Sequence, residues 1–503
     1  MTIQNLPGSE PLYSAAQTRE LDRCTIEDHG VPGIVLMSRA AAAAFECLRG
    51  VWPAPSCIYV LCGTGNNGGD GFLMADLAHK RGIKVIVYQL GDASKIGGDA
   101  HTAREQARAN GVVISPFTVD CLEGVAGAVI VDAMLGTGLG GAVREPYVAA
   151  IAAINASGLP VLAVDIPSGL CSDTGRVLGH AVCADVTVSF IGLKRGLFTL
   201  DAPDNTGAIH FTDLQIPTEV YAQLPSSCSR LELEPLLECL PERPGASHKG
   251  SYGSVLVIGG DKGMAGAVVM AAEAALRCGA GLVRVATHAE HVPALVARTP
   301  EVMAHGVRTV AELAPLIEQS DMLVVGPGLG QSPWSEQMLQ AALASNKPLV
   351  LDADGLNLLL REGRASAPRD NWVLTPHPGE ASRLLGCTTA DIQGDRFAAV
   401  QRLQQKFGGI VILKGNGSLI ASEEQTLLSD YGNPGMASGG MGDVLSGVLG
   451  ALLAQADAHG QTVLESVALA VCLHGAAADM AAQDGMRGLC ATDLIPRMRE
   501  LLG

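Results

Sequence analysis

Short apolar runs alternate with longer amphipathic segments along roughly the first 220 residues of the chain. Five of these runs are rich in β-branched residues and contain few polar positions, which is typical of strands covered on both faces. They are CIYVLCG, IKVIVYQL, AVIVDAML, PVLAVDIP and ADVTVSFIG, at 57–63, 83–90, 128–135, 160–167 and 184–192. Because strands that alternate with helices form parallel sheets, this part is predicted to be a parallel α/β domain.

Helices are expected before and between these strands. SAAQTRELDRCTIEDHG predicts a helix, because Ser14 and Gln17 have the spacing of a capping box and Gly30 would end it. A second helix is expected over 38–49. The uncharged stretch 146–164 is interrupted by NASGLP, so it predicts a helix followed by a strand and not a membrane span.

A second alternating series begins near residue 250. Its strand-like runs are SVLVIGG, GLVRVAT, DMLVVGPG, KPLVLDADG and IVILKG, at 254–260, 281–287, 321–328, 347–355 and 410–415. Between 218 and 249 the alternation lapses into a segment with prolines and small polar residues, which is typical of a domain boundary. We therefore expect an α/β protein of two domains, 1–220 and 249–503, with a linker region at 221–248; the first is predicted to be a Rossmann-like parallel-sheet sandwich.

Composition narrows the classes of function. The chain has 503 residues, of which 48% are hydrophobic and 17% charged, enough apolar material for two cores. Its formal net charge of −17 argues against nucleic acid as a partner, since such binding depends on clustered Lys and Arg. The thirteen cysteines lack zinc-ligand spacing and the N-terminus lacks the features of a secretory signal, so we expect reduced thiols in a cytoplasmic protein.

The loop GTGNNGGDG, at 63–71, lies between a predicted strand and a predicted helix. Backbone amides at such a helix start can bind an anion, and Gly63, Gly65 and Gly68 satisfy the dinucleotide-binding pattern GxGxxG. Gly136, Gly138 and Gly141 satisfy it as well. A tight strand-to-helix turn is the alternative for either loop.

Three polar residues follow predicted strands and should therefore meet at one edge of the first sheet. They are Asp132 in VDAMLGTGLGGA, and Asp165 and Ser168 in VDIPSGL. Ligands of open α/β sheets bind at the carboxyl edge, and a carboxylate in a partly dry cleft can work as an acid or base. Asp165 is the best candidate, although a helix cap or turn would explain either aspartate by itself.

In the second domain, ASGGMGDVLSG places Asp443 among four glycines, directly before an apolar helical run. Free backbone N–H groups there would form an anion-binding nest, where charge on a transferring phosphoryl group would be stabilised. Asp443 could then act as a base toward a substrate hydroxyl. The alternative is a helix N-cap.

The motifs GTGNNGGDG, DAMLGTGLGG and DIPSGL, in this order, resemble the N-terminal epimerase domain of the bifunctional NAD(P)H-hydrate repair enzymes. The resemblance implies interconversion of the R and S hydrates of NADH or NADPH, with Asp165 as the catalytic residue beside the nicotinamide. It implies a potassium ion held by Asn67, Asp132 and Ser168. The implied substrate contacts are Asn66, Asn67, Gly68, Gly69 and Asp70, then Gly136, Thr137, Gly138, Leu139, Gly140, Gly141 and Ala142, together with Asp165.

The second half is similar to the ribokinase-like superfamily through its GxGD arrangement and the upstream KGNGS, at 414–418. More closely, GPGLG, LDADGLNLL, LTPHPGE and GNPGMASGGMGDVLSG resemble the ADP- or ATP-dependent NAD(P)H-hydrate dehydratases of the same repair family. Phosphorylating the ring hydroxyl would make it a good leaving group, so a kinase-like site could drive dehydration.

This second resemblance implies ADP-dependent, or alternatively ATP-dependent, dehydration of the S epimer back to NAD(P)H, giving AMP and phosphate. Magnesium and an adenine nucleotide would be required. The expected hydrate contacts are Ala267, Gly328, His377 and the catalytic Asp443, and the expected nucleotide contacts are Lys414, Gly415, Asn416, Gly417, Ser418 and Gly442. The whole chain would be an isomerase and a lyase of metabolite repair, and we expect a homo-oligomer that binds neither nucleic acid nor membrane.

Three other readings of the sequence remain open. A vitamin-precursor kinase would share the nest at Asp443 but would leave the DIPSGL domain without a role. The first domain could instead be a non-catalytic nucleotide- or RNA-binding module. A nicotinamide-dependent dehydrogenase could use GTGNNGG with Asp92 as the ribose-binding acid, but no hydride-transfer constellation accompanies it.

Overall fold

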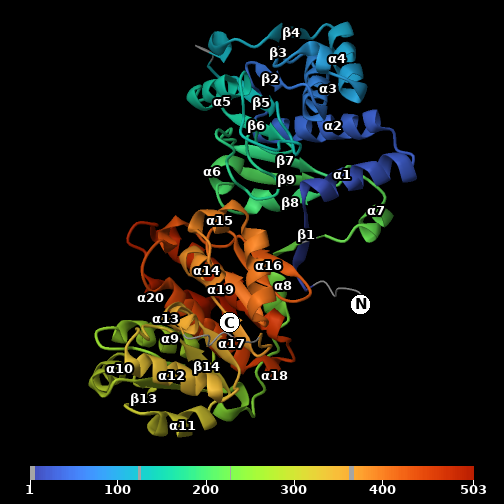
Figure 1. The fold of residues 1–503 in the computed structure, drawn as a ribbon. Helices are drawn as coiled ribbons and strands as arrows, with labels where there is room; N and C mark the ends of the chain where they lie inside the picture. The colour runs from blue at the N-terminus through green and yellow to red at the C-terminus, as the bar shows by residue number, and fades with distance from the viewer. Residues whose placement is uncertain (1–5, 123–125, 227, 362–367) are drawn as a thin grey trace. The chain divides into compact units, whose positions relative to one another are not determined.

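The structure is a computed structural model that describes residues 6–122, 126–226, 228–361 and 368–503 (Figure 1). The chain divides into two compact units: Pro11–Cys228, here the N-terminal unit, and Met1–Glu10 with Ser229–Gly503, here the C-terminal unit. The expected linker region, 221–248, contains the strand β10 (Cys228–Leu231) and the helix α8 (Leu233–Glu238). The assignment of 1–220 and 249–503 to separate activities stays a prediction.

The N-terminal unit is built on a seven-stranded parallel sheet in the order β4-β3-β2-β5-β6-β7-β9. Val60 in the central strand pairs with Val87 on one side and with Val131 on the other. The strands are β2 (Ile58–Cys62), β3 (Val85–Gln89), β4 (Val113–Pro116), β5 (Val129–Ala133), β6 (Val161–Val164), β7 (Val186–Phe190) and β9 (Ala208–Thr212), and β1 (Ser9–Tyr13) pairs separately with β8 (Leu193–Lys194). All five strands predicted from the apolar runs of this unit are confirmed.

Residues of one strand alternate between two cores, which makes the unit a three-layer sandwich. Ile58, Val60 and Cys62 belong to a core shared with α2, α3 and α4, whereas Tyr59 and Leu61 pack with α5 on the other face. The helices are α1 (Ala15–Arg23), α2 (Gly33–Val51), α3 (Asn66–Lys80), α4 (Gly98–Ala109), α5 (Tyr147–Ala156), α6 (Pro203–Thr206) and α7 (Thr218–Gln223). Both faces of the sheet are therefore covered, as the apolar strands require.

The expected capping box at the start of α1 is confirmed. Gln17 N–H donates to Ser14 Oγ over 3.2 Å, and Ser14 N–H donates to Gln17 Oε1 over 3.0 Å. The helical path continues through a π-helical turn, Cys24–Asp28, before Gly30. The second helix begins at Gly33, earlier than expected, because Pro32 fixes its entry and the added first turn contributes the buried Leu36 and Met37.

The C-terminal unit contains a larger, mixed sheet in the order β13-β12-β11-β14-β15-β16-β17-β18-β19-β10. Its strands are parallel from β13 to β17, but β18 runs antiparallel to both of its neighbours. The bounds are β11 (Ser254–Ile258), β12 (Leu282–Thr287), β13 (Met303–Gly306), β14 (Met322–Val325), β15 (Leu349–Leu351), β16 (Trp372–Leu374), β17 (Ile410–Leu413), β18 (Ser418–Ala421) and β19 (Thr426–Ser429).

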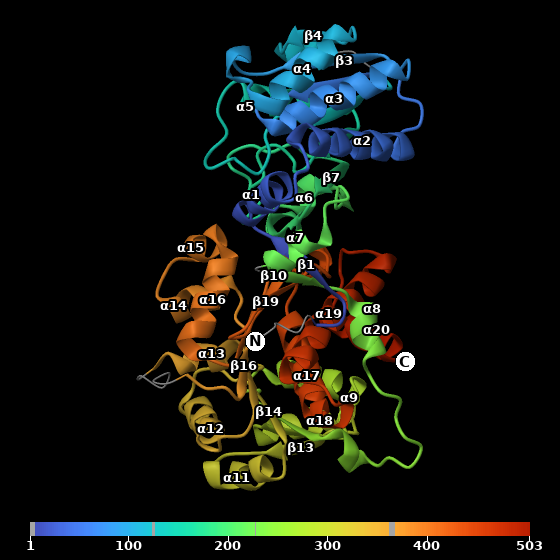
Figure 2. The ribbon, with the colours of Figure 1, turned by 90° about the vertical axis from the view of Figure 1, so that its right-hand side faces the viewer.

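Helices cover both faces of this sheet (Figure 2). A core cluster joins one face to α9, α17, α19 and α20, while α12, α13, α14 and α16 lie on the other side. The helices are α9 (Ala265–Arg277), α10 (Val292–Arg298), α11 (Val310–Glu318), α12 (Pro333–Ala344), α13 (Ala353–Leu359), α14 (Pro378–Leu385), α15 (Thr389–Gly394), α16 (Arg396–Phe407), α17 (Met441–Ala454), α18 (Ala456–His459), α19 (Val463–Ala481) and α20 (Ala491–Leu502).

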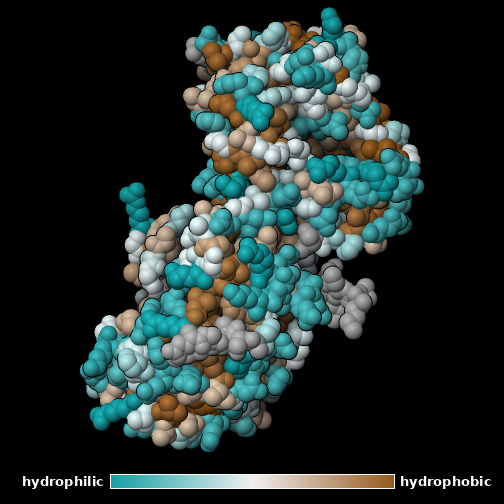
Figure 3. Space-filling model, viewed as in Figure 1, coloured by the Kyte–Doolittle hydropathy of each residue, from teal (hydrophilic) through white to brown (hydrophobic). Residues whose placement is uncertain are grey.

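Within the described part of the chain, one helix is long and apolar enough to cross a membrane. The segment Val463–Asp484, which contains α19, has 72% of its apolar window buried inside the unit, so it is a core helix. On the face drawn in Figure 3, hydrophilic side chains predominate and hydrophobic ones form small separate groups.

Candidate active sites

The glycine-rich loop of the N-terminal unit connects β2 to α3, as the sequence predicts. Gly65 is the N-cap of α3 and no side chain caps the helix, so its first backbone N–H groups remain available to a ligand. Packing also requires glycine here, because a Cβ on Gly63 would overlap the Met134 carbonyl oxygen and one on Gly68 would overlap the Gly63 carbonyl oxygen. The second GxGxxG match, by contrast, lies in the irregular segment between β5 and α5 and not at a helix start.

Asp132 and Ser168 meet at the carboxyl edge of the sheet. Ser168 Oγ donates to Asp132 Oδ1 over 2.6 Å, and Ser168 N–H donates to Oδ2 over 2.7 Å. Burial raises the pKa of the Asp132 carboxyl to about 6, although the hydrogen bonds from Ser168 oppose that rise. Leu135 lies beside them, and its N–H donates to Ser168 Oγ over 2.8 Å.

Asn67 completes this group from the first turn of α3. Its Nδ2 donates to the Leu135 carbonyl over 3.1 Å, while its Oδ1 is buried and has no hydrogen-bond partner among the described residues. A buried oxygen without a donor next to a carboxylate and a backbone carbonyl suits a hard cation, which prefers oxygen ligands. The three residues expected to hold potassium therefore come together and have the right chemistry.

A cavity of about 580 Å³ opens in front of these loops. It contains Asp165 and most of the expected substrate contacts, namely Asn66, Asn67, Asp70 and the run Gly136, Thr137, Gly138, Leu139 and Gly140. Four expected contacts are outside its lining. Gly68 and Gly69 are buried behind it, where a Cβ on Gly69 would lie 2.6 Å from Met37 Sδ, and Gly141 and Ala142 are exposed farther along the loop. Their contact with substrate stays a prediction.

Asp165 directly follows β6 and has a left-handed backbone, with φ of 68°, which is uncommon for a non-glycine residue. Its carboxylate forms a very short ion pair with the Lys194 ammonium and accepts a hydrogen bond from Phe190 N–H over 3.3 Å. The Lys194 side chain is only 1% exposed. Sequence reasoning missed Lys194, although a lysine inside the apolar run SFIGLKRGLF was a signal that could have identified it.

Two further carboxyls, Asp22 of α1 and Asp70 of α3, share the cavity with Asp165. Asp22 was also missed, since it lies in an amphipathic helix whose polar residues are expected to face solvent. Asp92, the ribose-binding acid of the dehydrogenase alternative, is instead exposed, and its carboxylate accepts from Ser94 N–H as the cap of a short 3₁₀ turn.

In the C-terminal unit, α17 begins at Met441 with Gly440 as its N-cap. Gly440 has φ of 96°, and a Cβ there would lie 2.7 Å from Met270 Cε, so the position requires glycine. Asp443 lies in the first turn of the helix and is not its N-cap, which contradicts the capping alternative. Burial raises the pKa of Asp443 to about 6, with a further rise from Asp352, whereas Lys414 opposes the rise.

Lys414 and Asp352 form the electrostatic centre of this site. Lys414 follows β17 and its Nζ lies 2.6 Å from Oδ1 of Asp352, which follows β15. Ser446 Oγ donates to Asp352 Oδ2 over 2.9 Å. A Cβ on Gly442 would lie 3.2 Å from Lys414 Nζ, so the start of α17 lies directly over the ion pair.

Both partners of this pair are held in their charged forms. Burial acts to raise the pKa of Asp352, but Lys414 outweighs it and the net shift is downward. Burial acts to lower the pKa of Lys414, but Asp352 and Glu380 outweigh it and the net shift is upward. Asp352 was not identified from the sequence, although its place after a strand was the same signal that identified Asp165.

A buried arginine supports the expected nucleotide loop, Lys414–Ser418, from behind. Arg396 of α16 is 1% exposed, and its guanidinium donates to the carbonyl oxygens of Leu413, Lys414 and Asn416. Burial lowers its pKa to about 10. Gly415 lies against the guanidinium with φ of 140°, and Ser418 Oγ donates to the Gly415 carbonyl over 3.2 Å.

Ala267 and Gly328, two expected hydrate contacts, are neighbours. Gly328 has φ of 53°, and a Cβ added to it would lie 3.0 Å from Ala267 Cβ on α9. At the end of the same loop, Gly330 N–H donates to Asp354 Oδ2 over 3.0 Å, which ties the loop to the segment that follows Asp352.

His377 is the N-cap of α14. Its Nδ1 accepts from Gly379 N–H over 3.0 Å. Burial, Lys414 and Arg383 lower its pKa, which keeps Nδ1 free to accept this hydrogen bond. The side chain is 51% exposed, and its Nε2 lies 3.3 Å from Glu380 Oε1.

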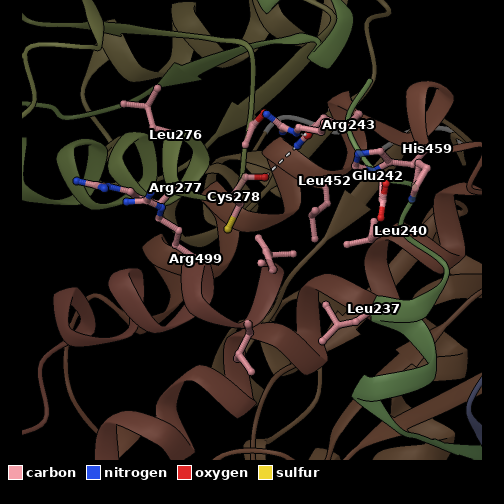
Figure 4. A pocket seen from close by; sticks show the side chains of 16 residues that line it. Leu237, Leu240, Glu242, Arg243, Leu276, Arg277, Cys278, Leu452, His459 and Arg499 are labelled. Carbon is pink, nitrogen blue, oxygen red and sulfur yellow. Dashed lines mark hydrogen bonds between the residues drawn. The ribbon is translucent and has the colours of Figure 1, made fainter. Parts of the chain in front are cut away.

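Another cavity of the C-terminal unit, of about 780 Å³, contains none of the residues expected from the sequence (Figure 4). It lies between α8, α9 and the C-terminal ends of α17 and α20, and Arg243 crosses it to donate to the Gly279 carbonyl over 2.8 Å and to Gln455 Oε1 over 2.9 Å. The chemistry-bearing groups of this unit are therefore elsewhere, around Lys414 and Asp443.

Comparisons with known proteins agree with both halves of the chain. A family model described as NAD(P)H-hydrate dehydratase matches residues 255–499, and one described as YjeF-related protein N-terminus matches residues 33–196. The bifunctional NAD(P)H-hydrate repair enzyme Nnr of Coxiella burnetii is 48% identical over 98% of this chain and 99% of its own length. The Escherichia coli enzyme of the same name is 43% identical over 100% of this chain and 96% of its own length.

Solved structures resemble the C-terminal unit. A ribokinase-like superfamily protein from Enterococcus faecalis has a TM-score of 0.50 and 31% identity, covering 55% of this chain and 95% of that one. An ADP/ATP-dependent NAD(P)H-hydrate dehydratase from Bacillus subtilis, co-crystallised with ATP and Mg²⁺, has a TM-score of 0.47 and 28% identity, covering 54% of this chain and 96% of that one. The ribokinase-like fold expected from the sequence is confirmed.

Proposed function

The chain belongs to the family of bifunctional NAD(P)H-hydrate repair enzymes, and from this premise we propose which unit performs each reaction and with which residues. Members of this family combine an epimerase, which is an isomerase, with a dehydratase, which is a lyase. We assign epimerisation of the R and S hydrates to the N-terminal unit, with Asp165 as a catalytic residue. We assign dehydration of the S hydrate to the C-terminal unit, with ADP as the phosphoryl donor.

The observation that carries the dehydratase assignment is the position of Asp443 in the first turn of α17, next to Gly442, which lies over the Lys414–Asp352 pair. A carboxylate in the first turn of a helix, beside backbone N–H groups and a lysine, suits proton removal next to a developing phosphate charge. The substrate hydroxyl would attack the terminal phosphorus of ADP, Asp443 would take its proton, and AMP would leave. Phosphate would then depart from the ring with loss of a neighbouring C–H proton, which restores the reduced nicotinamide.

The remaining expected contacts of this unit are proposed on the same geometry. Gly442 and the loop Lys414–Ser418, which Arg396 supports, would contact the adenine nucleotide, whereas Ala267, Gly328 and the half-exposed ring of His377 would contact the hydrate. Among the described residues no group of three or more His, Cys, Asp or Glu side chains could hold a metal, so magnesium would arrive with the nucleotide phosphates.

In the N-terminal unit, Asn67, Asp132 and Ser168 would hold potassium, a choice supported by Asn67 Oδ1, which has no hydrogen-bond partner among the residues that the structure describes. The bound ion would supply a fixed positive charge beside the loops that contact the damaged nucleotide. We further propose a cytoplasmic location, which suits thirteen free cysteines, and a homo-oligomer, for which the small share of charged residues, 17%, is suitable.

The test is the recovery of reduced-nicotinamide absorbance from an epimer mixture of NADH hydrate, with magnesium, potassium and either ADP or ATP. Full recovery with ADP is expected. Full recovery with ATP and none with ADP would identify ATP as the phosphoryl donor. Recovery that stops when one epimer is consumed would remove the epimerase assignment, provided that the no-enzyme control epimerises slowly. If neither nucleotide gave any recovery, the dehydratase assignment would fail and a small-molecule kinase would become the better reading.

A further inference from the structure

The cavity of the N-terminal unit brings three carboxyl groups toward one ammonium group. Asp22 comes from α1, Asp70 from α3 and Asp165 from the loop after β6, and all three line the cavity together with Lys194 of β8. These elements are far apart in the sequence, so only the fold brings the four charges together. A catalytic role for one aspartate alone leaves the other three groups unexplained.

Lys194 has fixed partners. Its Nζ pairs with the Asp165 carboxylate, donates to Ser189 Oγ over 3.1 Å and donates to the Phe190 carbonyl over 2.9 Å. An ammonium group has three donors, so all of them are used and the lysine cannot swing toward Asp70 or Asp22 without losing these bonds. One carboxylate, Asp165, is therefore neutralised at contact distance while the other two are not.

The electrostatic consequence falls on the other two aspartates. Burial, followed by the nearby charges of Asp165 and Asp22, raises the pKa of Asp70 well above its usual range, and Lys194 only partly opposes this. Burial also raises the pKa of Asp22 to about 6, again opposed by Lys194 and increased by Asp165. Burial and the nearby carboxylates thus favour the protonated form of Asp70, beside an aspartate that is paired with an ammonium.

Other titratable or charged groups around Asp70 do not change this arrangement. The Cys62 thiol lies close enough for Asp70 to raise its pKa, after burial, so it stays neutral. The remaining such groups that line the cavity are Arg19 from α1, Asp99 from α4 and Tyr147 from α5.

We propose that Asp70 is a second catalytic residue of the epimerase, donating a proton while Asp165 accepts one, and that Lys194 is the positioning residue that makes the two aspartates different. This inference rests on the proposed function of the N-terminal unit. It assigns a chemical role to Asp70, for which the sequence suggests substrate contact only.

The C–O bond at the hydroxyl-bearing ring carbon breaks, and the oxygen leaves as water with the proton of Asp70. The lone pair of the ring nitrogen forms a C=N bond to this carbon, which becomes trigonal and shares the positive charge. Water then adds to the opposite face and gives a proton to Asp165, and the electron pair returns to nitrogen. After this conversion Asp165 carries the proton and Asp70 is ionised. The reverse reaction starts from these two states, so one pair of aspartates serves both epimers.

The first experiment compares Asp70→Asn with the parent chain and with Asp120→Asn, a matched removal of an exposed carboxylate outside the cavity. Conversion of the pure R hydrate to S is followed by chromatography without nucleotide, so that the dehydratase is idle. We expect kcat for Asp70→Asn to fall at least 100-fold with KM within about threefold, as for loss of a proton donor. The control should match the parent, and S-hydrate dehydration by each variant should be unchanged.

The second experiment measures the epimerase rate against pH for Lys194→Met, Lys194→Arg and the exposed control Lys84→Met. Lys194 lowers the pKa of Asp70 and of Asp22, so loss of the ammonium should raise both pKa values and move the pH profile about one unit to higher pH. Lys194→Arg should reverse most of that shift, because it keeps the positive charge. If Lys194 only supported the fold, its loss would instead lower the rate equally at every pH.

The outcomes separate this inference from the proposed function. A parent chain that does not interconvert the hydrates would overturn the epimerase assignment. An active parent with Asp70→Asn within threefold of it, or a Lys194→Met profile that coincides with the parent's, would overturn only the acid–base pair. If Asp70→Asn does not fold, the Lys194→Met profile decides the question.

Discussion

Lys414 Nζ lies 2.6 Å from Asp352 Oδ1, and the Asp352 side chain is only 2% exposed. The pair connects the carboxyl ends of β15 and β17, and Ser446 links it to α17, where Asp443 also lies. An ammonium this close to a carboxylate keeps its proton, so Lys414 can present a positive charge to phosphate without acting as a proton donor. The proton acceptor of the site is then Asp443, which Lys414 does not contact directly.

The dehydratase should lose activity on the acid side of pH 6. Asp443 must be ionised to accept a proton, and burial raises its pKa to about 6, so the rate should fall roughly tenfold per pH unit below that value. The measurement is kcat/KM for the S hydrate between pH 5 and 8 with saturating ADP. Because Lys414 lowers this pKa, Lys414→Met should move the limb to higher pH. A limb near pH 4 would mean that Asp443 is not the base.

The two activities should be lost separately. We expect Asp443→Asn to reduce dehydration at least 100-fold and to leave epimerisation at the parent rate, and Asp165→Asn to do the reverse. Each variant thus serves as the folding control of the other. Equal loss of both activities in either variant would contradict the assignment of one catalytic aspartate to each unit.

Potassium dependence should belong to the N-terminal unit only. Asn67→Ala removes the buried side-chain oxygen that has no partner in the described part of the chain, so we expect the potassium concentration for half-maximal epimerisation to rise at least tenfold. The assay titrates KCl at constant ionic strength with a sodium-only reference. Dehydration of pure S hydrate is the internal control and should not respond. An epimerase rate independent of potassium in the parent chain would contradict the site.

Arg396 should stabilise the C-terminal unit and its nucleotide loop together. Arg396→Met leaves the carbonyls of Leu413, Lys414 and Asn416 without this donor, which should cost about 3 kcal/mol of unfolding free energy. Arg402→Met, an exposed arginine on the same helix, is the matched control. Calorimetry should show a lower unfolding temperature for the C-terminal unit, and KM for ADP should rise. An unchanged KM would show that the loop does not depend on Arg396.

Much of the fold is readable from the sequence because buried parallel strands carry continuous apolar runs. The central strands follow directly, as does the capping box at Ser14, since its spacing is local. The short strand β16 could not be predicted in the same way, because Trp-Val-Leu gives only three apolar residues. Nor could the reversal at β18, since strand direction depends on tertiary connections and not on periodicity.

The same distinction between local and tertiary signals applies to the residues of the candidate sites. Asp132, Asp165 and Asp443 are identifiable because each lies at the end of a strand or in the first turn of a helix beside glycines, and the rule for ligand edges is general. Lys194 and Arg396 are not, because a buried cation is placed by partners distant in the sequence. Asp165 illustrates both cases: its position is predictable, but its left-handed backbone and its lysine partner are not.

The burial of α19 has a consequence for how the protein is made. This helix belongs to the core that α9, α17 and α20 share with the sheet, yet it is encoded within the last fifty residues of the chain. While the ribosome is still synthesising those residues, the apolar faces of α9 and α17 have no cover. A truncated transcript would therefore give an incomplete, aggregation-prone C-terminal unit, whereas the N-terminal unit would already have all of its strands.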